Sequence, residues 1–236
     1  MVKRSLHYSN IDGMLTSASS SIFSSFIIPF ALLLKATAAD VGVLTAVQNL
    51  AHTVSQVPGA KATEYFSRKN VWLFSRVMSR LVFFVPVIML PFLGLENPVL
   101  WLVLFTALIF FFMGLGLPAW SSLMGDLVTA ETRGRYFSRR NILVAAAGIV
   151  STVIAGYFIG ALGFPSIFIL SALFGMAAIP FFMKMYETPM HRVFHYRHSF
   201  AVHPSGWMPA LRANRGLAVF TVYMTLINFA IHIAAG

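Results

Sequence analysis

The sequence contains no cysteine, which excludes disulfide bonds, thiol catalysis and thiolate metal sites. It is also short of charge, because only 10% of its 236 residues are Asp, Glu, Lys or Arg. Acidic residues are especially few, with 7 against 17 basic residues, which gives a formal net charge of +10. A soluble domain of this length needs far more polar surface to stay dispersed. The composition therefore excludes an ordinary soluble domain.

The sequence is instead rich in apolar residues, which make up 58% of it and include 23 Phe. An apolar run of about 20 residues crosses the roughly 30 Å hydrocarbon core of a bilayer as a helix. Helices are expected because unpaired backbone groups in lipid cost several kcal/mol each. We predict an all-α polytopic membrane protein with spans near residues 11–34, 41–59, 71–93, 98–123, 141–162, 165–185 and 216–233.

The basic residues lie in short clusters between the apolar runs, so an anionic lipid surface explains them better than a nucleic acid does. Every second connector is basic, and basic connectors stay on the cytoplasmic side of a membrane. These connectors contain Lys3, Arg4, Lys61, Arg68, Lys69, Arg133, Arg135, Arg139, Arg140, Lys184, Arg192, Arg197, Arg212 and Arg215. The other connectors contain only Lys35, Asp40 and Glu96. The pattern predicts an integral protein of the plasma membrane with a cytoplasmic N-terminus.

Two basic connectors carry the most specific residue patterns. Residues 59–69 read GAKATEYFSRK, and residues 125–135 read GDLVTAETRGR. Acidic side chains at helix ends can pair with the basic residues beside them. We interpret the two connectors as a cytoplasmic latch with the candidate residues Glu64, Arg68, Lys69, Asp126, Arg133 and Arg135. The alternative is that these are ordinary interfacial charges, since exposed pairs contribute less than ~1 kcal/mol.

Both connectors resemble those of the major facilitator superfamily of secondary transporters. In that family the first connector carries a small residue, an acid, a glycine and two basic residues. The matching residues here are Ala60, Glu64, Ser67, Arg68 and Lys69, with Glu in place of Asp and Ser in place of Gly. The resemblance covers the whole chain and implies transport of a small solute by alternating access, without enzymatic activity. Thr106 stands about where proton-coupled members often carry Arg, so the coupling ion stays open.

The resemblance also implies a domain organisation. Residues 1–186 are expected to form a six-helix bundle of two inverted three-helix repeats, and residues 187–215 a cytoplasmic basic amphipathic linker. Residues 216–236 are expected to form a seventh transmembrane helix that begins a second bundle. We therefore expect an N-terminal fragment whose partner is the missing C-terminal bundle or a second copy. The alternatives are a non-transporting membrane partner or a dimerising half-transporter; a seven-helix receptor has the opposite N-terminal orientation.

Polar residues inside the predicted spans are candidates for the substrate pathway. Gln48, His52 and Gln56 recur every four residues in the second span and therefore share one helical face. Asn228 and His232 form a similar pair in the seventh span. Polar side chains in a membrane helix face a partner or a water-filled cavity. The alternative is that they bind neighbouring helices.

Arg80 is the remaining candidate for the substrate pathway. It lies about 18 Å along a helix from Arg68, at 1.5 Å per residue, which places it roughly in mid-membrane. A charge at that depth costs about 2.5 kcal/mol or more, so it needs a partner or a function. We expect no acidic residue at comparable depth, so the partner is an anionic substrate or a residue of the missing half; alternatively Arg80 binds backbone carbonyls near a bend. No cofactor or metal is expected.

Overall fold

The computed structural model describes residues 2–89, 96–187, 214, 216, 218, 219, 222, 223 and 225–227, with the backbone alone for residues 84–89. The chain divides into two compact units, Met1–Pro189 and Met190–Gly236. In the second unit, the described residues between 216 and 227 are helical. Most of the predicted linker and seventh span, including Asn228 and His232, lies outside the described residues.

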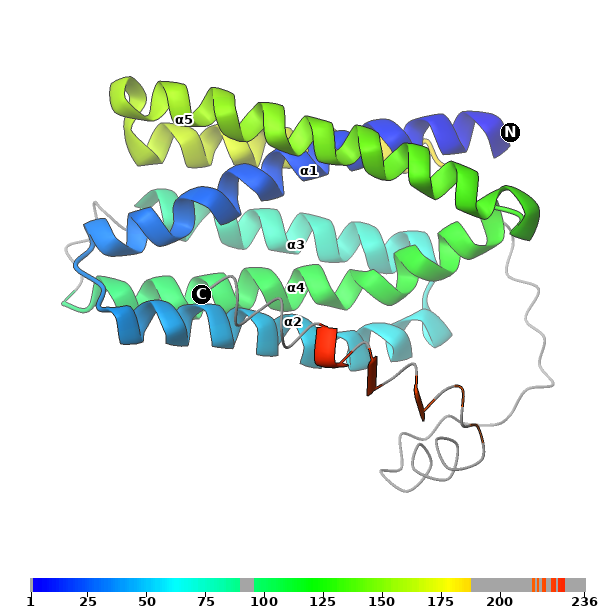
Figure 1. The fold of residues 1–236 in the computed structure, drawn as a ribbon, viewed down its shortest axis with the longest axis horizontal. Helices are drawn as coiled ribbons and strands as arrows, with labels where there is room; N and C mark the ends of the chain where they lie inside the picture. The colour runs from blue at the N-terminus through cyan, green and yellow to red at the C-terminus, as the bar shows by residue number, and fades with distance from the viewer. Residues whose placement is uncertain are drawn as a thin grey trace. The chain divides into compact units, whose positions relative to one another are not determined.

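The first unit is helical throughout its described length. Its elements are α1 (Val2–Leu33), α2 (Ala38–Tyr65), α3 (Arg68–Met89), α4 (Pro98–Leu127) and α5 (Ala130–Met183). Gly163 interrupts α5 with φ 71° and ψ 170°, and the chain reverses direction there (Figure 1). The first unit therefore has six helical segments, which correspond to the first six predicted spans. The prediction of an all-helical chain with long apolar helices is confirmed.

Some of these helices, but not all, are both long enough and apolar enough to qualify as membrane spans. By length and composition, α1, α4 and α5 qualify as membrane-spanning helices in the described residues. In the described residues α2 and α3 are not among the qualifying helices; α2 carries Gln48 and His52, and α3 carries Arg76 and Arg80. These residues lower the hydropathy of α2 and α3, so composition alone does not establish the predicted seven-span arrangement.

The helices pack in two groups that meet at α3. The α1 helix lies along α5, while α2 and α3 lie along α4, and α3 also contacts α5 (Figure 1). Aromatic rings fill the centre, where Phe23 and Phe83 meet edge to face at 4.9 Å between centroids. Phe168 of α5 packs against both rings. Apolar side chains gain little from leaving lipid for a helix interface, so close packing and polar contacts hold such a bundle together.

Two glycines allow α2 and α4 to approach closely. A Cβ on Gly59 would overlap the carbonyl oxygen of Leu115, and a Cβ on Gly114 would overlap that of His52. Small residues at such crossings let the two backbones touch. The polar face of α2 is therefore held firmly against α4.

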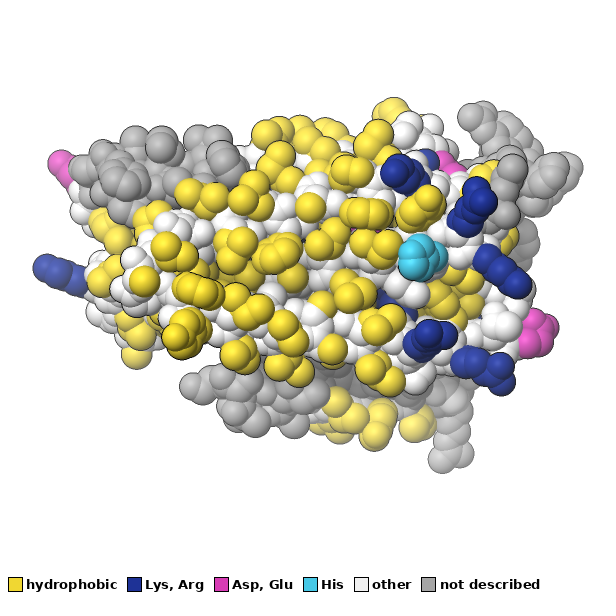
Figure 2. Space-filling model, turned by 90° about the horizontal axis from the view of Figure 1, so that it is seen from above, with side chains coloured by type: hydrophobic (Ala, Val, Ile, Leu, Met, Phe, Trp, Pro, Cys, Tyr) yellow, Lys and Arg dark blue, Asp and Glu magenta, His cyan; other side chains and the backbone are white. Residues whose placement is uncertain are grey.

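Most of the exposed basic side chains visible in Figure 2 lie at one end of the bundle. Lys and Arg side chains cluster at one end of the visible face, and apolar side chains form a broad band beside them (Figure 2). The start of α1 and the connectors α2–α3 and α4–α5 all lie at the same end of the first unit (Figure 1). The connectors with basic residues in the sequence thus share one end of the bundle.

The opposite end is shaped by local hydrogen bonds between α1 and α2. Lys35 adopts φ 67°, and the Ala36 N–H donates to the Ala31 carbonyl at 3.0 Å, which closes α1 with a left-handed cap. Thr37 then caps α2: its N–H donates to Asp40 Oδ2 at 2.8 Å, and its hydroxyl accepts from the Asp40 N–H at 3.2 Å. The Thr37 hydrogen bonds lower the pKa of the Asp40 carboxyl below its usual value.

This cap predicts a pH-dependent effect of Asp40→Asn. Because the folded-state pKa is lowered, the Asp40 charge stabilises the fold above the unfolded-state pKa, about 3.9. That contribution is lost as pH falls through the folded-state value. We expect the variant to melt at a lower temperature than the parent at pH 7 in detergent, with the difference closing below about pH 4. A difference that is constant from pH 7 to pH 3 would contradict the assignment.

Candidate functional site

The shortest ion pair in the described residues joins the two latch connectors. Arg68 at the start of α3 donates from Nη1 to Asp126 Oδ2 near the end of α4 at 2.6 Å. The same Nη1 donates to the Ser122 hydroxyl at 3.0 Å. The Arg68 side chain is 6% exposed, whereas that of Asp126 is 48% exposed. An arginine at this position also neutralises the negative end of the α4 dipole.

Two further latch candidates bind helix C-termini. Lys69 Nζ donates to the carbonyls of Met183 at 2.6 Å and Met185 at 3.0 Å, where α5 ends. Arg133 Nη2, in the first turn of α5, reaches back to the carbonyl of Gly125 at 3.3 Å. Cations in these places satisfy carbonyls that have no partner within the helix. Each of these basic side chains therefore caps a helix end. Both lie at the end of the bundle that holds the basic connectors, which we call the basic pole (Figure 1).

The remaining two latch candidates are solvent-exposed. Glu64 near the end of α2 and Arg135 in α5 make no ion pair or hydrogen bond with any part of the chain that the structure describes. Glu131 lies one turn before Arg135. Hydrogen bonds from the Glu131 backbone N–H and from the Thr129 side chain lower the pKa of the Glu131 carboxyl. A carboxylate that stays charged suits the first turn of α5, where the helix dipole is positive.

The predicted polar face of α2 divides between buried and partly exposed side chains. Gln48 is 8% exposed, and its Nε2 has no hydrogen-bond partner among the described residues. Gln56 Nε2 donates to the His52 carbonyl at 3.4 Å, and the His52 ring packs edge-on against Phe110 of α4 at 6.4 Å. His52 thus lies at the α2–α4 contact, and Gln48 and Gln56 lie one turn before and after it on the same face of α2. Within the described chain, no group of three His, Asp or Glu side chains is placed to hold a metal.

A buried acid that sequence reasoning missed lies among the arginines. Asp12 of α1 is 2% exposed, and its Oδ2 lies 3.5 Å from Arg76 Nη2. Arg76 also donates from Nη1 to Thr16 at 2.6 Å and stacks over Trp72 at 4.5 Å. The expectation that no acid lies at the depth of Arg80 is wrong, because Asp12 is within electrostatic range of both Arg76 and Arg80.

The oversight has a physical reason. The α1 helix begins at Val2, so Asp12 lies well inside a helix rather than at its edge. Asp12 and Thr16 are four residues apart and share one face of α1. The sequence does contain a signal for this contact. It is a lone acid followed four residues later by a hydroxyl residue, together with arginines in another predicted span.

A third buried arginine approaches from α5. Arg140 is 9% exposed and stacks over Trp120 at 5.0 Å, and Gly13 of α1 leaves room for its guanidinium. Its Nε has no hydrogen-bond partner among the described residues. Nearby, the Tyr136 hydroxyl donates to the Leu6 carbonyl at 3.3 Å, and burial raises the pKa of that hydroxyl. The charge pattern of the sequence places Arg140 among the basic connector residues and does not predict its burial.

Arg80 is the most isolated of these cations. It is 8% exposed, and its Nε has no hydrogen-bond partner in the described part of the chain. Its guanidinium lies against the backbone of Gly175 in α5, where any Cβ would overlap it. It also borders a cavity of about 190 Å³ between α1 and α4, together with Ser21 and Ser24. The lining of the cavity thus combines a buried positive charge with serine side chains.

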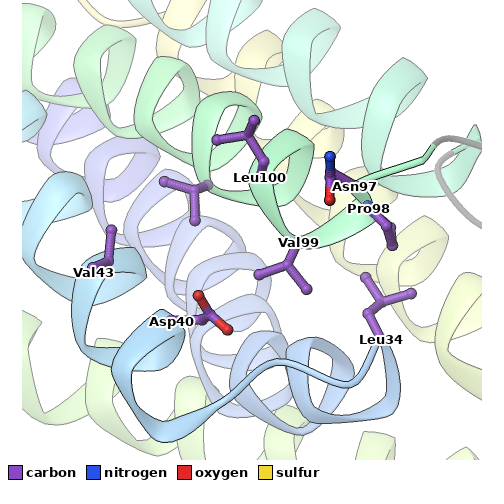
Figure 3. Close-up of a pocket in the computed structure, with 8 residues that line it drawn as sticks. Leu34, Asp40, Val43, Asn97, Pro98, Val99 and Leu100 are labelled. Atoms are coloured by element: carbon purple, nitrogen blue, oxygen red, sulfur yellow. The ribbon is translucent and has the colours of Figure 1, made fainter.

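A second, larger hollow of about 390 Å³ lies at the opposite end of the bundle from the basic connectors. Asp40 of α2 and Asn97 at the start of α4 face it among apolar side chains such as Val43 and Val99 (Figure 3). The Asp40 carboxylate is already engaged by Thr37. Within the described residues the Asn97 side chain makes no capping hydrogen bond, so it is the polar group of this hollow that is not engaged at a helix end.

The comparison with protein families agrees with the helical bundle and its connectors. The chain matches the Major Facilitator Superfamily over residues 13–235. It therefore belongs to this superfamily of membrane transporters, and it is not an enzyme. No curated protein matches the chain.

The buried cluster of Asp12, Arg76, Arg80 and Arg140 predicts an asymmetric response to mutation. Asp12→Asn leaves three cations without their carboxylate, and breaking a buried pair in this way costs about 3–5 kcal/mol. Arg76→Gln leaves Asp12 near the two remaining arginines, so we expect a smaller loss of thermal stability in detergent.

The double variant Asp12→Asn/Arg76→Gln should recover part of the loss caused by Asp12→Asn, because it removes one of the three cations. The Asp126 side chain is half-exposed, so the Asp126→Asn variant shows for comparison the loss of stability when an acid near the solvent is removed. Equal losses from Asp12→Asn and Arg76→Gln would show an isolated pair and contradict the cluster.

Proposed function

We propose that the chain is a secondary active transporter that moves a small solute by alternating access, with its six-helix unit as one half of the pathway. Membership of the superfamily supports transport as the function. The observation that carries the proposal is the cavity between α1 and α4, which is bordered by the buried Arg80. A charged side chain within a membrane bundle is costly and marks solute or ion pathways.

The proposed orientation places the basic pole in the cytoplasm. The N-terminus and the connectors α2–α3 and α4–α5 lie at this pole, and basic connectors stay inside. We propose the plasma membrane as the location. The sequence contains no nucleotide-binding loop, so a solute or ion gradient is the proposed source of energy.

The proposed latch works in two parts. The Arg68–Asp126 pair joins α3 to α4 within one bundle, so it fixes the shape of the cytoplasmic end rather than bridging two bundles. Lys69 and Arg133 support that shape at the ends of α5 and α4. Glu64 and Arg135 are exposed at the same pole, and we propose that they meet the second bundle when the cytoplasmic side closes.

Alternating access requires a second bundle that faces the first across the pathway. We propose that it is a C-terminal bundle or a second copy of the chain. Gln48, His52 and Gln56 would then contribute from α2, and Asn228 and His232 from the seventh span. A coupling ion, if one is used, would share this pathway.

The absence of cysteine allows a direct test by single-cysteine labelling. Ser24→Cys borders the cavity, Lys35→Cys lies in the α1–α2 connector, and Thr132→Cys lies in the first turn of α5. Alternating access predicts that a membrane-impermeant maleimide reaches Ser24→Cys from either side of oriented membranes. It should reach Lys35→Cys only from outside and Thr132→Cys only from the cytoplasm.

The two connector variants serve as controls for membrane sidedness and for leakage of the reagent. Reaction of Ser24→Cys from one side only, with both controls behaving as expected, would contradict alternating access. Reversed sidedness of the controls would contradict the proposed orientation alone.

A further inference from the structure

The buried charges of α1, α3 and α5 do not balance, and one of them, Arg80, lines the α1–α4 cavity. Within the described residues, three buried guanidinium groups, those of Arg76, Arg80 and Arg140, lie within electrostatic range of the single carboxylate of Asp12. Arginine cannot lose its proton in a protein, so these charges persist at every physiological pH. The cluster therefore carries an excess of two positive charges.

Two of the three arginines have clear partners. Arg76 contacts Asp12, Thr16 and the face of Trp72, and Arg140 lies over the face of Trp120. Arg80 has neither an acceptor nor an aromatic face among the described residues. Its alternative role, binding backbone carbonyls near a bend, finds no support there. It is therefore the cation for which the described chain provides no counter-group.

The wall of the cavity opposite Arg80 supplies hydroxyl groups. Ser20, Ser21 and Ser24 of α1 line it. Ser20 and Ser24 donate to the carbonyls of Ser17 and Ser21 at 3.3 Å, which is long for an O–H···O bond. The Ser21 hydroxyl makes no hydrogen bond with the described chain and lies close to the backbone of Gly148 in α5. An anion is a stronger acceptor than a distant carbonyl, so these hydroxyls can turn toward one.

The cavity is small and partly open, since Ser24 in its lining is exposed. Its volume is about 190 Å³, below the roughly 300–1,000 Å³ of sites for drug-sized ligands. Phe83, Phe110 and Met113 complete the lining with apolar surface. An apolar lining strengthens the attraction between a guanidinium group and an anion. The space suits a compact ion with a few oxygen atoms.

We propose that this cavity binds a small oxyanion, of the carboxylate, phosphate or sulfate type, between the Arg80 guanidinium and the hydroxyls of Ser20, Ser21 and Ser24. The inference rests on the proposed function, because it makes this anion the transported solute. Gly175 is a positioning residue, since its missing side chain makes the space that Arg80 occupies. The planar guanidinium matches two oxygens of such an anion, which an ammonium group does not.

The test is equilibrium binding to the purified full chain in detergent, with inorganic phosphate, sulfate and lactate as probes. Calorimetry and thermal shift are measured at constant ionic strength, with chloride as the reference anion. We expect saturable binding of at least one probe. Removal of a charged partner typically weakens binding by about 10- to 100-fold, so we expect a loss of this size in Arg80→Gln and a marked loss in Arg80→Lys.

Milder variants keep the test valid if Arg80→Gln does not fold. Ser24→Ala should weaken binding by about 3- to 10-fold, the effect of one hydrogen bond. Its control is Ser25→Ala, which changes the same residue type one position away and outside the cavity lining. Gly175→Ala should weaken binding by displacing Arg80, whereas Gly160→Ala, where a Cβ meets open space, should not.

The outcomes separate this inference from the proposed function, because binding requires no translocation. Saturable binding that is weakened in Ser24→Ala and Gly175→Ala, and unchanged in both controls, supports the oxyanion site. Absence of binding beyond chloride, or equal binding by all variants, overturns it while leaving transport of another solute in place. Binding with one-sided labelling of Ser24→Cys would support the site and overturn alternating access.

Discussion

The constraint on which the rest of the structure depends is the cost of an arginine charge inside a membrane-spanning bundle. A guanidinium group stays charged, so burial obliges the fold to place an anion, an oxygen or an aromatic face beside it. Arg68 meets Asp126, Arg76 meets Asp12, and Arg140 meets Trp120. Within the described residues Arg80 has no such partner, and it lies at the wall of a cavity. The position of the Arg80 guanidinium at a cavity wall is the feature that links helix packing most clearly to transport.

Glycines make these encounters possible. Apolar burial contributes little to helix association in lipid, so the distance of approach between backbones decides which polar groups can meet. Gly13 admits Arg140 beside Asp12, and Gly175 admits Arg80. Gly59 and Gly114 bring α2 against α4, which fixes the polar residues of α2 at that contact. Gly13 and Gly175 therefore leave the space that the guanidinium groups of Arg140 and Arg80 occupy.

The helices were predictable from sequence, because apolar length and basic connectors are local properties. The reversal at Gly163 fell between two predicted spans, as did the connector that holds Arg68. Contacts between helices were not predictable in the same way. Asp12 and Arg76 are far apart in sequence, and their meeting depends on the rotation of α1 and α3 about their axes. Hydropathy contains no information about that rotation, so Asp12 was overlooked, and Arg140 was taken for a surface charge.

The central claim is that Arg80 receives its counter-charge from a bound oxyanion. The most direct measurement is anomalous diffraction from crystals of the full chain soaked in selenate, an analogue of sulfate whose selenium atom can be located. The account predicts a selenium peak in the cavity between α1 and α4, within hydrogen-bonding reach of Arg80 and Ser21, and its loss in Ser24→Ala/Arg80→Lys crystals. Selenium peaks confined to the exposed basic residues at the bundle end, with an empty cavity at saturating selenate, would contradict it.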